Sequence, residues 1–512
     1  MNIRELLENQ VNKDPEKAYL YFEDQEITYG DFDKRINKVA NALLNTGILK
    51  GDRFAIMLPN SPEFLYTWFG LNKIGAVEVP INTRLKHQEV QYILTHSESK
   101  GIVVQSDYFP LIESITADLP VLKQTVLVGA EAPSQTTLFR DWISDESYQL
   151  PSIPLSEDDS AAIIYTSGTT ARPKGVLLSH RSFVLTGESY AFMIDGSSND
   201  RVMTPNPLFH VNAQAYSTMG SLAAGASLIL IKKFSRSRIL EQTRRYGATK
   251  LVLVQAITPW VWSRPIQEDD GDNPVKTVIA GNWPKEIYHN FERRFRVKNQ
   301  TIYSLTEAPL GIMGPREGTG PRKVGGIGIP MEHPDSTIKN EVKIVNKACE
   351  ELPPGERGEI IIRNPAVMIG YFKDPEKTAE TKLAGWIYTG DIGYRDQSGY
   401  FFFVGRKKET LRRRGELISP VEIESVINKH PKVQESAVIG VPSGIGTGEE
   451  EIKAYILLKT GESATTEEII AWCSERLAEF KIPRYLEFRT DFPRSSIGRI
   501  QKHVLKAEKA DL

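Results

Sequence analysis

The sequence predicts an α/β protein, in which a large N-terminal domain of mainly parallel sheets, helices and a small β-rich subdomain precedes a small α+β domain. Three observations predict this fold. Short apolar runs alternate with longer amphipathic runs over the first 400 or so residues. After Gly355 the pattern changes to closely spaced short strands and turns. The last 105 or so residues then combine two helices with two strands, which is enough for a separate small domain.

In the N-terminal part, the alternation is that of strand, helix and strand. The chain opens on a helix start, the expected strands are 53–58, 228–232, 251–256, 275–280 and 301–303, and the expected helices are 63–73, 237–246 and 284–295. Because the carboxyl ends of parallel strands meet at one edge of a sheet, we expect the ligand site at that edge.

The C-terminal part begins after a β-rich stretch with expected strands at 358–363, 385–389 and 400–404. A charged run at 406–415 follows, and we place the domain boundary inside it, giving domains 1–407 and 408–512. The expected elements after this run are helices 421–430 and 467–480 and strands 435–441 and 451–459.

Composition excludes several classes of protein. The chain has 63 Lys and Arg against 65 Asp and Glu, so its net charge of −2 gives no field that would attract nucleic acid or an anionic membrane. A hydrophobic content of 40% is ordinary for a globular protein, and no apolar stretch reaches the roughly 18 residues of a membrane span. Two cysteines cannot form a disulfide framework. We therefore expect a cytoplasmic protein without nucleic-acid or membrane partners.

The segment at 165–176 is the most informative about chemistry, because it follows an apolar strand and concentrates hydroxyls, glycines and a lysine in one loop. These groups suit a triphosphate, which needs many donors, close approach of the backbone and a mobile cation. A flexible surface loop is the alternative. The candidate phosphate-binding residues are Thr166, Ser167, Gly168, Thr169, Thr170 and Lys174.

This segment is similar to the phosphate-loop signature of the adenylate-forming superfamily, which includes acyl- and aryl-CoA synthetases, nonribosomal adenylation domains and beetle luciferases. Other motifs of the family follow in its order along nearly the whole chain: Pro207-Leu208-Phe209-His210, Tyr303-Ser304-Leu305-Thr306-Glu307, Gly370-Tyr371, Gly385-Trp386-Ile387-Tyr388-Thr389-Gly390-Asp391, Gly405-Arg406-Lys407-Lys408 and Arg414-Gly415-Glu416. The resemblance implies a large N-terminal domain and a small mobile C-terminal domain.

The resemblance assigns nucleotide-binding roles to residues of these motifs. It implies that Glu307, together with Thr170, binds Mg²⁺, for which a carboxylate is a suitable hard oxygen ligand. A buried structural glutamate is the alternative. Thr306 would donate to the α-phosphate, Tyr303 would stack on the adenine, and Asp391 and Arg406 would bind the ribose. The remaining residues that the resemblance places at the nucleotide are Gly281, Asn282 and Ser304.

The resemblance also implies the reaction. A carboxylic acid would attack the α-phosphate of ATP, pyrophosphate would leave, and the acyl-adenylate would pass to a thiol, commonly that of coenzyme A. Between the two steps the small domain would rotate about a hinge at Lys408, and Gly415 would then line the thiol tunnel. Homodimers are common in the family, but the sequence identifies no self-complementary patch, so the oligomeric state stays open.

One catalytic position departs from the family. Arg499 stands where the family has its catalytic lysine, which keeps the charge but replaces a compact ammonium with a planar guanidinium. Three interpretations remain open: an arginine that works after small adjustments, a substitution introduced to trap an intermediate, or a natural enzyme with a shifted balance between the two half-reactions.

The walls of the expected acid pocket bear on the choice of substrate. The resemblance makes His210 the ring that gates the carboxylate pocket, and the expected pocket walls are Val211, Asn212, Trp260 and Trp283. With Trp262, three tryptophans are expected near this region, and the bulky indole of Trp283 favours a short or medium acid. Several passages look most like crotonobetaine/carnitine CoA ligases, and indole rings attract the trimethylammonium group of such substrates. Packing of these indoles into the core is the alternative.

We therefore predict an ATP- and Mg²⁺-dependent acid:CoA ligase that activates a short or medium carboxylic acid, with betaine-type acids among the candidates. One alternative is an adenylating ligase that transfers the acyl group to an amine or a carrier-protein thiol. The other is a nucleotide-binding form whose chemistry is impaired by Arg499.

Overall fold

The computed structural model describes residues 1–512 except 132, 134–135, 150–151, 167–172, 255–256, 282, 408–410, 414–415, 443–449, 478, 496–497 and 509–512. The chain forms two compact units. The first comprises Met1–Val342, Ile362–Ile387 and Gly399–Phe401, and the second comprises Lys343–Ile361, Tyr388–Ser398 and Phe402–Leu512. The division that we predicted between 407 and 408 stays a prediction, because Lys408 lies outside the described residues.

The first unit contains a nine-stranded sheet in the order β16-β15-β14-β13-β12-β10-β11-β1-β2. Its strands are β1 (Ala18–Phe22), β2 (Gln25–Thr28), β10 (Arg201–Thr204), β11 (Ser227–Leu230), β12 (Lys250–Leu253), β13 (Thr277–Gly281), β14 (Lys298–Leu305), β15 (Ala308–Met313) and β16 (Ile329–Pro330). The six adjacent strands β14, β13, β12, β10, β11 and β1 are parallel to one another, so their carboxyl ends lie at one edge of the sheet.

The same unit contains an eight-stranded sheet in the order β19-β9-β8-β4-β3-β5-β6-β7. Its strands are β3 (Arg53–Met57), β4 (Val77–Pro80), β5 (Gly101–Gln105), β6 (Gln124–Val128), β7 (Thr137–Leu138), β8 (Ser160–Thr166), β9 (Lys174–Ser179) and β19 (Gly370–Tyr371). The six adjacent strands β7, β6, β5, β3, β4 and β8 run parallel to one another. Strand β9 then pairs antiparallel with β8 as a hairpin.

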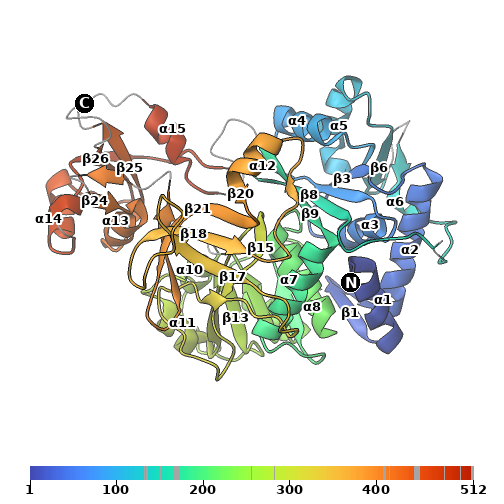
Figure 1. Cartoon of the computed structure of the whole chain (residues 1–512), viewed down its shortest axis with the longest axis horizontal. Helices are drawn as coiled ribbons and strands as arrows, with labels where there is room; N and C mark the ends of the chain where they lie inside the picture. The colour runs from blue at the N-terminus through green and yellow to red at the C-terminus, as the bar shows by residue number, and fades with distance from the viewer. Residues whose placement is uncertain are drawn as a thin grey trace. The chain divides into compact units, whose positions relative to one another are not determined.

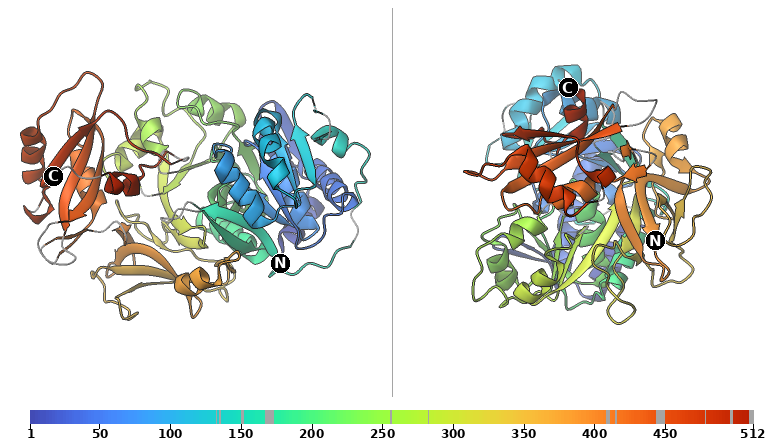
Figure 2. Two further views of the ribbon diagram at one scale, coloured as in Figure 1. Left: turned by 90° about the horizontal axis from the view of Figure 1, so that it is seen from above. Right: turned by 90° about the vertical axis from the view of Figure 1, so that its left-hand side faces the viewer.

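Helices cover both sheets. They are α1 (Ile3–Lys13), α2 (Tyr29–Asn45), α3 (Pro62–Lys73), α4 (His87–Ser97), α5 (Phe109–Ile115), α6 (Phe139–Trp142), α7 (His180–Met193), α8 (Met219–Ala224), α9 (Ile239–Tyr246), α10 (Thr258–Trp262), α11 (Tyr288–Phe295) and α12 (Pro375–Thr381), with 3₁₀ turns η1 (Ser106–Tyr108) and η2 (Thr116–Asp118). Helix α7 lies beside α8 (Figure 1) and packs on β9 of one sheet and β15 of the other, so it lies between the two sheets. Helices α1, α2 and α3 form a second group, drawn in blue in Figure 2.

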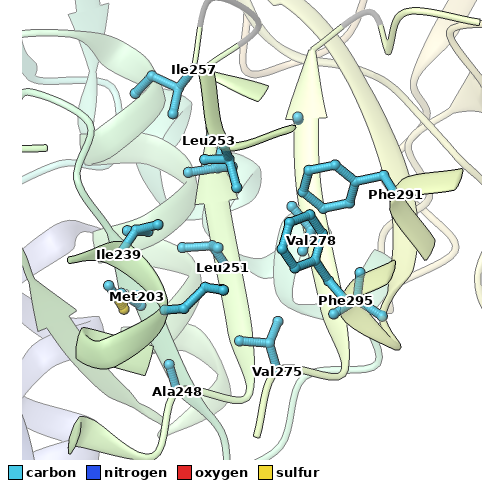
Figure 3. Close-up of a cluster of buried hydrophobic side chains, with 14 of the residues drawn as sticks. Met203, Ile239, Ala248, Leu251, Leu253, Ile257, Val275, Val278, Phe291 and Phe295 are labelled. Carbon is cyan, nitrogen blue, oxygen red and sulfur yellow. The ribbon is translucent and has the colours of Figure 1, made fainter. Parts of the chain in front are cut away.

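The core of the nine-stranded sheet explains why α9 and α11 form where the amphipathic pattern predicts them. Their apolar residues, including Ile239 and Phe291, face Leu251 of β12 and Val278 of β13 in one buried cluster (Figure 3). Helix α11 begins at Tyr288 rather than at 284 as predicted, because residues 284–287 form a separate turn in which the Ile287 amide donates to the Pro284 carbonyl.

The strands of a third sheet, in the order β17-β18-β21-β20 with β22 paired to β21, are divided between the two units. They are β17 (Glu341–Val345), β18 (Gly358–Arg363), β20 (Lys382–Leu383), β21 (Trp386–Arg395) and β22 (Phe401–Arg406). The predicted strands at 358–363, 385–389 and 400–404 correspond to β18, β21 and β22.

The rest of the second unit is the predicted α+β arrangement. It contains β23 (Leu411–Arg413), β24 (Glu416–Ile418), the three-stranded sheet of β25 (Val433–Pro442), β26 (Glu450–Leu458) and β27 (Tyr485–Arg489), helices α13 (Pro420–Ile427), α14 (Thr466–Ser474) and α15 (Lys502–Ala507), and the 3₁₀ turn η4 (Glu479–Lys481). Helix α14 ends six residues before the predicted end at 480, in a turn where the amides of Arg476 and Leu477 both donate to the Cys473 carbonyl. In the part of the chain that the structure describes, no helix combines the length and apolarity needed to span a membrane.

Candidate active site

The predicted phosphate loop connects β8 to β9. Its residues Ser167, Gly168, Thr169 and Thr170 lie outside the described residues, as do Asn282, Lys408 and Gly415. The two ends of the loop are described. Strand β8 ends at Thr166 and β9 begins at Lys174, and these two residues pair across the hairpin, so their backbone positions are set by the sheet.

Glu307 and Lys174 are brought to one place by Tyr371, a residue from the Gly370-Tyr371 motif to which we assigned no role. The Tyr371 hydroxyl donates to Oε1 of Glu307 at 2.7 Å, and Nζ of Lys174 lies 5.1 Å from the centre of the Tyr371 ring. Burial, followed by the neighbouring Glu307, raises the pKa of Tyr371, so its hydroxyl stays protonated and acts as the donor.

The two large sheets meet at this contact. Thr306 and Glu307 form the turn between β14 and β15 in the nine-stranded sheet, whereas Tyr371 lies on β19 of the eight-stranded sheet. The backbone of the segment before β19 adds a second link, because the Met368 amide donates to the Glu307 carbonyl at 2.9 Å. Glu307 is therefore fixed through both its backbone and its side chain.

The surroundings of Glu307 fit the magnesium role implied by the resemblance. Its carboxyl group is only partly buried, and Oε2 makes no hydrogen bond to any described residue while Oε1 is held by Tyr371. A Mg²⁺ ion bound by one carboxylate completes its shell with water and phosphate oxygens, so one such ligand is sufficient. No cluster of three or more His, Cys, Asp or Glu side chains that could hold a metal occurs among the described residues.

The nucleotide residues predicted on β13 and β14 lie at the carboxyl edge of the nine-stranded sheet. Gly281 is the last residue of β13 and pairs with Ile302, next to Tyr303 and Ser304 near the end of β14. Both of these residues are partly exposed, as ligand contacts require. The hydroxyl of the buried Tyr216 donates to the Pro309 carbonyl on β15, the strand that pairs with β14.

The predicted carboxylate-pocket segment leads into an element that sequence reasoning missed. His210, whose ring packs edge-on against Phe209 at 4.5 Å, and the buried Val211 precede a π-helix, η3 (Asn212–Thr218). The Asn206 amide donates to Oδ1 of Asn212 at 2.7 Å and anchors its first residue. A π-helix is rare and is found mostly at functional sites, but no residue pattern in the sequence distinguishes it from an α-helix.

The three tryptophans have separate surroundings. Trp283 is 3% exposed, donates from Nε1 to the Gln300 carbonyl and packs edge-on against Phe291 at 5.0 Å. The ring of Trp262 is covered by the Arg294 guanidinium at 5.4 Å, whereas Trp260 is 59% exposed. For Trp283 these contacts are those of the core-packing alternative, and its place in a substrate pocket stays a prediction.

In the second unit, the two residues predicted to bind the ribose lie in contact. Nε of Arg406 on β22 is 2.8 Å from Oδ1 of Asp391 on β21. The Asp391 side chain is only 2% exposed, whereas that of Arg406 is 48% exposed and also donates to the Thr389 carbonyl. A buried carboxylate held against a half-exposed guanidinium offers both an acceptor and donors to a diol.

Arg499 lies in a short backbone loop near the C-terminus. Its amide donates to the Ser495 hydroxyl at 3.2 Å, and the Ser495 amide donates to its carbonyl at 2.8 Å. The residue is exposed, so its guanidinium can reach a ligand.

The chain matches the AMP-binding enzyme family over residues 7–372 and the AMP-binding enzyme C-terminal domain over residues 422–499. Crotonobetaine/carnitine–CoA ligases from Citrobacter koseri and Salmonella typhimurium are 35% and 34% identical to it over 521 aligned residues, which cover 99% of this chain and 99% of each relative.

Solved structures agree with these relatives. An anthranilate CoA ligase in complex with anthranoyl-AMP superposes with a TM-score of 0.90 at 28% identity, over 99% of this chain and 97% of the other. The ATP-bound MatB from Rhodopseudomonas palustris gives a TM-score of 0.88 at 28% identity, over 100% of this chain and 99% of the other. The predicted resemblance and the predicted α/β fold with a smaller C-terminal domain are thus confirmed.

Proposed function

This chain belongs to the AMP-binding enzyme family and is an AMP-forming acyl-CoA synthetase, and we propose that the acid it activates is short or medium in length and of betaine type. The observation that carries this proposal is the similarity to crotonobetaine/carnitine–CoA ligases at 35% identity along 99% of both chains. Both compounds are short acids with a trimethylammonium group, and the length expected from the sequence agrees with them.

The first half-reaction is assigned to the first unit. We propose that Lys174 and the Thr306 hydroxyl bind phosphate oxygens of ATP, and that Glu307, held by Tyr371, binds a magnesium ion. The magnesium ion, when bound, neutralises charge on the phosphates as pyrophosphate leaves. The rigid hold on Glu307 supports this assignment, because a ligand aligned before binding costs little reorganisation when charge develops.

The remaining roles stay proposals of the same kind. Asp391 and Arg406 hold the ribose, Tyr303 stacks on the adenine, and His210 closes the carboxylate pocket. Arg499 contributes the positive charge that the family obtains from lysine. Lys408 acts as the hinge that lets the C-terminal domain rotate between adenylation and thioester formation.

Acid-dependent release of pyrophosphate from ATP and Mg²⁺ tests the acid class. The acids are a betaine-type acid, its isostere with carbon in place of the quaternary nitrogen, a short aliphatic acid and an aromatic acid. We expect the highest kcat/KM for the betaine-type acid. An isostere or an aromatic acid that is used equally well would refute the betaine proposal, and release with none of these acids would refute the proposed range of substrates.

The same assay on Arg499→Lys tests the catalytic assignment. We expect faster adenylation in the lysine variant, because an ammonium fits between carboxylate and phosphate oxygens better than a planar guanidinium does. Equal rates would show that Arg499 works fully in place of lysine. Addition of coenzyme A should then convert the adenylate to a thioester with release of AMP, whereas AMP release only with an amine or a carrier protein would contradict the proposed acceptor.

A further inference from the structure

Helix α4 holds both ends of the loop that connects β8 to β9. Tyr92 and His96 lie one turn apart on this helix, and their rings stack with centroids 5.3 Å apart. The Tyr92 hydroxyl donates to the Pro173 carbonyl at 3.2 Å, and Nδ1 of His96 lies 2.8 Å from the Tyr165 hydroxyl. Tyr165 is the penultimate residue of β8 and Pro173 is the residue before β9, so one helix face contacts both ends of the connection.

The contact between His96 and Tyr165 joins two uncharged groups. Burial raises the pKa of Tyr165, so its hydroxyl keeps its proton. Burial, followed by the charge of Lys373, lowers the pKa of His96, so the imidazole is neutral near pH 7. The contact between Nδ1 of His96 and the Tyr165 hydroxyl is therefore a hydrogen bond between two neutral groups.

Phe372 and Lys373 also contact His96. Phe372 packs edge-on against His96 with centroids 5.8 Å apart, and its amide donates to the Gly175 carbonyl at 2.8 Å. The end of α4 is held by Lys373, which donates to the His96 carbonyl and pairs with Glu98 at 2.7 Å. Helix α4 is therefore a fixed support and not an independent surface element.

Strand β19 and the residue after it couple this support to the candidate site. Successive residues of an extended chain point to opposite sides, and Tyr371 contacts Glu307 and Lys174 while Phe372 contacts His96. Lys174 is consequently held on two sides. Its ammonium group lies near the Tyr371 ring, and the preceding residue, Pro173, accepts the hydrogen bond from Tyr92.

We propose that Tyr92 and His96 are a positioning pair, which holds Tyr165 and Pro173 so that the adjacent Thr166 and Lys174 are aligned for the phosphates of ATP. The inference rests on the proposed nucleotide role of Thr166 and Lys174, and neither member of the pair touches ATP. Fixing these two ends before ATP binds lowers the entropic cost of ordering the binding groups.

The test compares variants by direct ATP binding, measured by calorimetry without acid, and by the steady-state KM values for ATP and for the acid. Tyr92→Phe and His96→Phe keep the rings and remove the hydrogen bonds. His96→Asn restores a polar atom near the position of Nδ1. Tyr246→Phe is the matched control. Tyr246 lies on α9, outside this cluster, and its hydroxyl donates to the Glu23 carbonyl at 2.8 Å.

We expect Tyr92→Phe and His96→Phe each to weaken ATP binding roughly three- to tenfold, the change expected for one hydrogen bond of ordinary strength. The KM for the acid should not change, His96→Asn should recover at least half of the loss, and Tyr246→Phe should bind ATP as the unmodified protein does. A purely structural role would instead lower the melting temperature and reduce the active fraction without a selective change in ATP affinity.

Two results would overturn the inference. One is unchanged ATP affinity in both Tyr92→Phe and His96→Phe. The other is a loss that follows the melting temperature and is not recovered in His96→Asn. If the unmodified protein itself does not bind ATP, the proposed function fails instead, so the two failures are distinguishable.

Discussion

Replacing Tyr371 with Phe tests whether the contact with Glu307 sets the activity of the site. The change removes the hydroxyl that donates to Oε1 of Glu307 at 2.7 Å and keeps the ring that lies 5.1 Å from Nζ of Lys174. A hydrogen bond to a charged group is worth about 1.5–3 kcal/mol. If the whole of that energy is used to align Glu307, kcat/KM for ATP falls about 10- to 150-fold.

The assay is pyrophosphate release at saturating acid while ATP and Mg²⁺ are varied independently. We expect a higher Mg²⁺ requirement in Tyr371→Phe, because its Glu307 carboxylate is no longer held in one orientation. Tyr29→Phe is the control: Tyr29 is equally a buried tyrosine, and it donates to the Ala226 carbonyl at 2.7 Å away from this contact. A kcat/KM within threefold of the unmodified enzyme, with a loss of stability like that of the control, would refute the reasoning.

Asp391→Asn removes the charge that pairs with Arg406, and we expect about tenfold weaker ATP binding by calorimetry; unchanged affinity would contradict the ribose role. Burial raises the pKa of Glu78, so the native state holds a proton that the unfolded chain releases above pH 4.5, and stability falls as pH rises. Glu78→Gln should therefore raise the melting temperature at pH 8 more than at pH 5, and equal shifts would show that Glu78 ionises normally. Burial lowers the pKa of His180 from 6.5 to about 4, so its neutral form, which accepts from the Ile3 amide, stabilises the fold above pH 6.5. About 3 kcal/mol should be lost as pH falls from 6.5 towards 4 in denaturant titrations, and His180→Gln should flatten this loss; an equally steep loss in the variant would assign it to other groups.

Most of the fold was predictable because its elements carry local patterns. The apolar run at 53–58 and the amphipathic run at 63–73 correspond closely to β3 and α3, where Ser61 caps the helix and Pro62 begins it. The exceptions arise where local pattern and backbone hydrogen bonding differ. The sequence 284–295 has helical periodicity throughout, but its first turn is separate from α11.

The candidate site was predictable only in its residue types. Thr306, Glu307, Asp391 and Arg406 stand in motifs whose order along the chain is characteristic of the family, so each could be named without a structure. Their partners could not. Tyr371 is 64 positions from Glu307 along the chain, and no periodic pattern connects the two.

The amino-acid sequence is sufficient to identify the family, the alternation of strands and helices, and the residues with nucleotide chemistry, because these are recorded in short contiguous segments. The three-dimensional packing is needed to see that Tyr371 joins Glu307 to Lys174, that Tyr92 and His96 hold the two ends of one loop, and that Trp283 packs against Phe291. These contacts join residues that are distant along the chain, and their geometry depends on how the sheets and helices pack and not on local sequence preference.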